Sequence, residues 1–170
     1  LLVGSGANLF GFLGEQSSRG LQIEAPISTT WLWIALFRPD LAVVGFNREI
    51  LTFQVAGVGT ETASAIMTPL MALALAGILL FGVWVTRTGA HAANLLPALS
   101  LAVVTSLIVF NKVGSPQFIL WLAVPIVVGL VSQGSRFTTP ALIALGLAAL
   151  TQIIYPFGYD GIVLLDPLAL

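Results

Sequence analysis

The chain has 170 residues, of which 58% are apolar and only 8% are charged. Soluble domains have about 45 to 50% apolar and about 25% charged residues, so this composition excludes an ordinary water-soluble protein and indicates a membrane protein. Six Lys and Arg residues leave no basic patch for nucleic acid. The absence of Cys and the single His exclude Cys-ligated and His-rich metal sites, and we expect no metal and no cofactor.

We predict no full membrane span within the first 67 residues. The chain starts at Leu1 without the positive segment of a signal peptide, so we expect it to be an internal piece of a longer protein. Residues 25–37 form a Trp-rich apolar run that is short for a span and predicts a re-entrant or interfacial helix. A span running through Arg38 and Asp40 to Phe46 is the alternative. Residues 41–58 alternate loosely and predict a short hairpin outside the hydrocarbon.

Four long uncharged segments follow. They contain 25 residues between Glu61 and Arg87, 20 between His91 and Lys112, 23 between Lys112 and Arg136, and 23 between Arg136 and Asp160. Each can form a helix of the roughly 20 apolar residues that cross a bilayer. We therefore predict an all-α polytopic transmembrane bundle with spans near 68–86, 93–110, 116–132 and 138–155. Thr68-Pro69, Asn94 with Pro97, Ser115-Pro116 and Thr139-Pro140 mark the helix starts, and Pro125 should kink the third span.

Charge bias predicts the orientation of these spans. The turns with Arg87 and Arg136 share one side, which the positive-inside rule makes cytoplasmic. Residues 1–67 then form an extracytoplasmic loop with the re-entrant or interfacial segment, 68–156 the four-span bundle, and 157–170 an extracytoplasmic tail that is truncated. The loop around Lys112 lies on the same outward face.

Two polar clusters fall on this predicted outward face. The first is residues 15–24, where Arg19, with Gln22 nearby, could bind a phosphate through its planar fork of donors while the carboxylate of Glu24 orients a hydroxyl. A solvated loop with Arg19 paired to a neighbouring carboxylate is the alternative. The second cluster is the turn 111–117, where Lys112 offers a point charge and Ser115 and Gln117 flank the start of the next helix.

The alternative for the second cluster is a plain turn with a snorkelling Lys and a Ser cap. If both clusters are functional, their shared face allows them to form one site.

The stretches Arg19–Glu24 (RGLQIE) and Ser115–Pro125 (SPQFILWLAVP) carry a family resemblance. They resemble the C-terminal half of bacterial multi-spanning glycosyltransferases of the GT-C superfamily, and most nearly glycosyltransferase family 87, the polyprenyl-phosphate-mannose-dependent mannosyltransferases. Ala25 stands where that family's first motif has Ser, whereas the second motif is intact. The two motifs cover about 20 of 170 residues.

The resemblance implies an enzyme of the bacterial plasma membrane that transfers a hexose, mannose by this likeness, from a polyprenyl-phosphate donor to a lipid or glycan acceptor on the extracytoplasmic side. The catalytic acidic residue of the superfamily lies in an early loop, so it is expected upstream of Leu1. Arg19, Gln22, Glu24, Lys112, Ser115 and Gln117 would line the substrate pocket. A transporter or flippase fragment and a non-catalytic assembly subunit are the alternatives, although the predicted spans lack the central ionisable residues of transport pathways.

Overall fold

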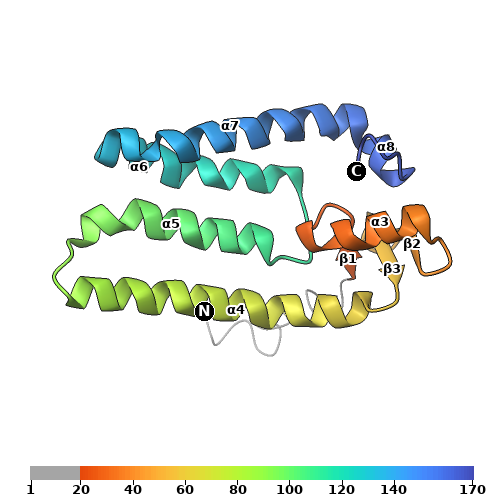
Figure 1. Ribbon diagram of the computed structural model, residues 1–170, viewed down its shortest axis with the longest axis horizontal. Coiled ribbons are helices and arrows are strands. Elements are labelled where there is room, and N and C mark those ends of the chain that lie inside the picture. Colours follow the sequence, from red (N-terminus) through yellow and green to blue (C-terminus); the bar gives the residue numbers. More distant parts are fainter. Residues whose placement is uncertain (1–19) are drawn as a thin grey trace, which may run out of the picture.

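The computed structural model describes residues 20–170 and is mostly helical, with one small sheet at one end (Figure 1). The elements in chain order are β1 (Leu21–Gln22), η2 (Pro26–Ser28), α3 (Thr29–Phe37), β2 (Ala42–Asn47), β3 (Thr52–Gly57), α4 (Thr60–Arg87), α5 (Ala92–Val109), η3 (Pro116–Leu122), α6 (Ala123–Gln133), η4 (Gly134–Phe137), α7 (Thr138–Gln152), η5 (Ile153–Gly158) and α8 (Tyr159–Val163).

The region before α4 follows the predicted order of a helix and then a hairpin. Helix α3 ends at Phe37, just before Arg38 pairs with Asp40 at 2.9 Å. The predicted hairpin is confirmed, because β2 and β3 pair antiparallel from Ala42 opposite Gly57 to Asn47 opposite Thr52. The alternative of one span running through to Phe46 is wrong, since Ala42–Asn47 is a strand.

The sequence did not predict strand β1. Leu21 and Gln22 pair antiparallel with β3, which places β3 in the middle of a three-stranded sheet. Four buried apolar side chains from these strands and from α3 form the core at this end of the molecule: Leu21, Ala35, Ala42 and Val55. This core holds β1, and with it the residues that follow, at a defined place.

The helical region forms two antiparallel hairpins, α4 with α5 and α6 with α7 (Figure 1). Two helical stretches of the described chain, Thr60–Arg87 and Pro116–Val163, are long and apolar enough to cross a membrane, whereas the apolar stretch Asn94–Val109 is shorter. The turns after α4 and α6 lie at one end, and the sheet, α3, the 110–115 loop and α8 lie at the other. The predicted grouping of these loops at opposite ends is therefore present.

Several prolines differ from their predicted places. Helix α4 begins at Thr60, so Pro69 lies inside it, and Pro97 lies inside α5 rather than at its start. The third predicted span is not one kinked α-helix, because a 3₁₀ segment ends at Leu122 and Pro125 is the third residue of α6. A first-turn amide has no partner within the helix, so proline costs no hydrogen bond there.

The fourth helix ends earlier than predicted. Helix α7 stops at Gln152, and Tyr155 has the extended backbone angles φ −118° and ψ 114°. A residue that precedes a proline avoids the helical region, and Pro156 follows Tyr155 directly. The chain therefore changes direction here, and residues 157–170 fold back toward α3 and the sheet.

Candidate functional site

The two polar clusters predicted from the sequence lie side by side. The amide N–H of Gln22 donates to the carbonyl of Lys112 at 3.1 Å, which joins β1 to the 110–115 loop. Gly114 lies so close to the backbone of Glu24 that a Cβ at this position would overlap the Glu24 carbonyl group. Residues about 90 positions apart in the sequence are thus in direct contact.

Glu24 is held on a tight turn between β1 and α3. The Ser28 hydroxyl is fully buried and lies 2.7 Å from the carbonyl of Ile23 and 2.6 Å from that of Ala25. The N–H of Ala25 also donates to the carbonyl of Gln22 at 3.0 Å. These bonds fix the backbone on both sides of Glu24, so its side chain leaves the turn in a defined direction.

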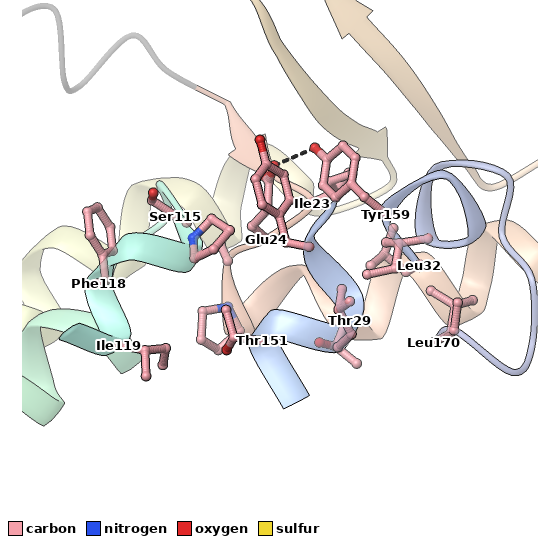
Figure 2. Close-up of a pocket in the computed structure, with 18 of the residues that line it drawn as sticks. Ile23, Glu24, Thr29, Leu32, Ser115, Phe118, Ile119, Thr151, Tyr159 and Leu170 are labelled. Atoms are coloured by element: carbon pink, nitrogen blue, oxygen red, sulfur yellow. Dashed lines mark hydrogen bonds between the residues drawn. The ribbon is translucent and has the colours of Figure 1, made fainter. Parts of the chain in front are cut away.

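A cavity of about 310 Å³ opens beside this turn, and we call it the Glu24 cavity (Figure 2). Its lining is mostly apolar and comes from α3, the 114–119 segment, the end of α7 and the C-terminal residues. The polar side chains that line it are Glu24, Thr29, Ser115, Thr151, Tyr155 and Tyr159. Two further pockets adjoin it and share Ser115, Pro116 and Tyr155, one reaching Gln117 and the other reaching Gln22.

Tyr159 on α8 lies next to Glu24 in the cavity lining, and a hydrogen bond joins the two side chains (Figure 2). Its hydroxyl donates to Oε1 of Glu24 at 2.5 Å, a length typical of a hydrogen bond to a charged oxygen. The second carboxylate oxygen, Oε2, is buried and has no hydrogen-bond partner among the described residues. Buried polar atoms nearly always have a partner, so Oε2 is an acceptor that still lacks a donor in the described part of the chain.

The structure places some of the predicted site residues at the cavity and others outside it. Gln22, Glu24, Ser115 and Gln117 line the Glu24 cavity or the pockets that adjoin it. Arg19 lies outside the described residues. The alternative of a Ser cap is not observed, because Ser115 makes no side-chain capping bond and its side chain lines the cavity instead.

Lys112 is neither a snorkelling residue nor part of the cavity lining. Its side chain is 6% exposed, and burial lowers the pKa of its ammonium group below the usual range. Among the described residues, the cavity lining contains one carboxylate and no Lys, Arg or His. A phosphate beside this single carboxylate would be repelled, whereas a neutral hydroxyl could donate to it. The described lining therefore suits a hydroxylated group attached to an apolar one.

The sequence pattern did not predict a role for Tyr159. Tyr159 is separated from Glu24 by 135 positions, and no local pattern connects the two. The Tyr155-Pro156 pair was the available signal, since it predicts that the chain leaves the helical path before Tyr159.

Comparison of the chain with known proteins found no similar protein. No family model, no curated protein and no solved structure matches the chain.

Proposed function

We propose that the chain is part of a membrane glycosyltransferase that takes a hexose, mannose in the first instance, from a polyprenyl-phosphate donor. The observation that carries the proposal is the meeting of the two segments that resemble family 87. The RGLQIE segment supplies Gln22 and Glu24, and the SPQF segment supplies Ser115 and Gln117, to the same group of pockets. Two separated motifs are expected to converge in this way if both bind one substrate.

The proposal places four spans in the bilayer, with the Glu24 cavity at the extracytoplasmic end. Exposed apolar side chains support this arrangement: Leu73, Leu80 and Trp84 of α4 and Leu142 and Leu145 of α7 are all more than half exposed. Only 11% of the most apolar part of α4 is buried. Such faces are unfavourable in water and are favoured against lipid.

The two ends of the donor would contact different residues. The sugar occupies the Glu24 cavity, where Glu24 and Ser115 meet its hydroxyls and the apolar lining covers its faces. The phosphate is neutralised by Arg19, whose planar fork of donors matches two phosphate oxygens. The acidic residue that activates the acceptor is supplied by another part of the full-length protein.

A transfer assay with the full-length protein tests this assignment. With a polyprenyl-phosphate mannose donor, we expect Arg19→Ala to lose transfer, and Arg19→Lys to lose most of it because the lysine keeps the charge and loses the fork. Unchanged transfer in Arg19→Ala would overturn the phosphate assignment.

Single-cysteine labelling tests the orientation, because the sequence contains no Cys. Thr88, directly after α4, and Gln117, the second residue of η3, are exposed at opposite ends of the molecule. We expect an impermeant thiol reagent added outside intact cells to label Gln117→Cys and not Thr88→Cys. Labelling of Thr88→Cys alone would reverse the orientation and place the Glu24 cavity on the cytoplasmic side.

A further inference from the structure

The C-terminal residues place Tyr159 with little freedom to move. After the extended residue Tyr155, the chain forms α8 beside the sheet. The ring of Tyr159 lies edge-on to the ring of Phe53 on β3, with centroids 6.2 Å apart, and edge-on to the ring of Tyr155, with centroids 5.2 Å apart. Such aromatic contacts fix the plane of the ring and therefore the direction of its hydroxyl.

The hydrogen bond from this fixed hydroxyl gives the two carboxylate oxygens of Glu24 different environments. Oε1 accepts from Tyr159, so the carboxylate can no longer rotate freely. Oε2 is left buried without a partner among the described residues. A buried acceptor without a donor is costly, and a ligand that supplies the donor recovers that cost on binding.

We propose that Tyr159 is a positioning residue, which holds Glu24 so that Oε2 accepts a hydrogen bond from a hydroxyl of the donor sugar. This inference rests on the proposed function, and it assigns the recognition of the sugar, as distinct from the phosphate, to the Tyr159 and Glu24 pair. Tyr159 itself contacts Glu24 rather than the reacting atoms. Residues 157–170 thus take part in the site and are more than a tail.

Binding of two matched probes tests the inference in the full-length protein. The probes are polyprenyl-phosphate mannose and the same polyprenyl phosphate without sugar, with affinities measured by calorimetry in detergent. We expect the unaltered protein to bind the mannosylated probe more tightly. In Tyr159→Phe, which keeps the ring and loses only the hydroxyl, we expect about tenfold weaker binding of the mannosylated probe and unchanged binding of the other.

Any other binding result contradicts either the positioning role of Tyr159, the sugar assignment or the proposed function. If the unaltered protein prefers the mannosylated probe and Tyr159→Phe keeps that preference, the positioning role is wrong and the proposed function stands. Equal weakening of both probes in a variant that keeps its thermal stability would show that Glu24 serves Arg19 and the phosphate, and would overturn the sugar assignment. If the unaltered protein shows no preference, both the inference and the proposed function are wrong.

Glu24→Gln provides a second variant if Tyr159→Phe does not fold. Glutamine keeps a carbonyl oxygen that can accept from Tyr159 and replaces the other oxygen with an amide that donates. We expect this variant to keep its thermal stability and to lose the preference for the mannosylated probe by about tenfold. A retained preference would overturn the role given to Oε2.

Discussion

Replacing Gly114 by alanine is expected to lower the thermal stability of the protein and to abolish the preference for a sugar-bearing ligand. Gly114 does not adopt a positive φ, so alanine is compatible with its backbone conformation. The obstacle is the neighbouring chain, because the new Cβ would overlap the carbonyl carbon and oxygen of Glu24 and lie 2.5 Å from the amide nitrogen of Ala25. Both segments must separate, which opens the Glu24 cavity at its base.

The expected cost is at the upper end of the roughly 1 to 3 kcal/mol found for overpacked positions, since backbone cannot move aside as a side chain can. Thermal unfolding in detergent measures it. Gly146→Ala is the matched control, because a Cβ at Gly146, in α7, meets no atom within 4 Å. That control should gain stability from the better helix propensity of alanine. Equal stability of the two variants would contradict the contact between the 110–115 loop and Glu24.

Replacing Ser28 by alanine is expected to cost about 1 to 3 kcal/mol of unfolding free energy, because it removes the hydroxyl donor that serves the turn around Glu24. The Ala25 carbonyl keeps a second donor, the amide N–H of Ser28 at 2.9 Å. The carbonyl of Ile23 loses the buried hydroxyl that lies 2.7 Å away. We expect the turn to loosen, with weaker binding of the mannosylated probe as a second effect.

Ser132→Ala removes a comparable hydroxyl at an exposed position. The Ser132 hydroxyl donates to the carbonyl of Val128 at 2.7 Å within the same helix, outside the Glu24 cavity. Its loss should change the unfolding free energy by less than about 0.5 kcal/mol. A stability for Ser28→Ala as high as for Ser132→Ala would show that the turn does not depend on the buried hydroxyl.

Some glycines in the helices lie at close contacts with neighbouring side chains, and others do not. Gly82 lies against Leu99 of α5, where an added Cβ would come within 2.8 Å of a leucine methyl, and Gly129 lies against the ring of Phe137. Gly77 in α4 and Gly146 in α7, by contrast, face open space. A glycine allows close approach, but whether another helix uses that freedom depends on tertiary packing.

The sequence alone determined the features that arise from local composition. The apolar segments between charged residues predict helical regions at the right places, and the alternation around Asn47 predicts the β2 and β3 hairpin. The end of α3 before Arg38 and Asp40 could also be read from the sequence, because two charged residues within three positions interrupt an apolar helix. Each of these features depends on residues that are close together in the sequence, within one helix or one hairpin. Composition and periodicity are informative over such short segments.

Only the tertiary structure decided the features that join distant segments. Strand β1 has two residues, too few to show a periodic pattern, and it exists because β3 offers it an edge. The close contact of Gly114 with Glu24, and the bond from Tyr159 to Glu24, depend on how α5, η3 and the chain after Tyr155 are directed in space. Such contacts leave no mark on the local pattern of either partner, because the energy that selects them comes from packing between elements rather than from the preferences of one segment.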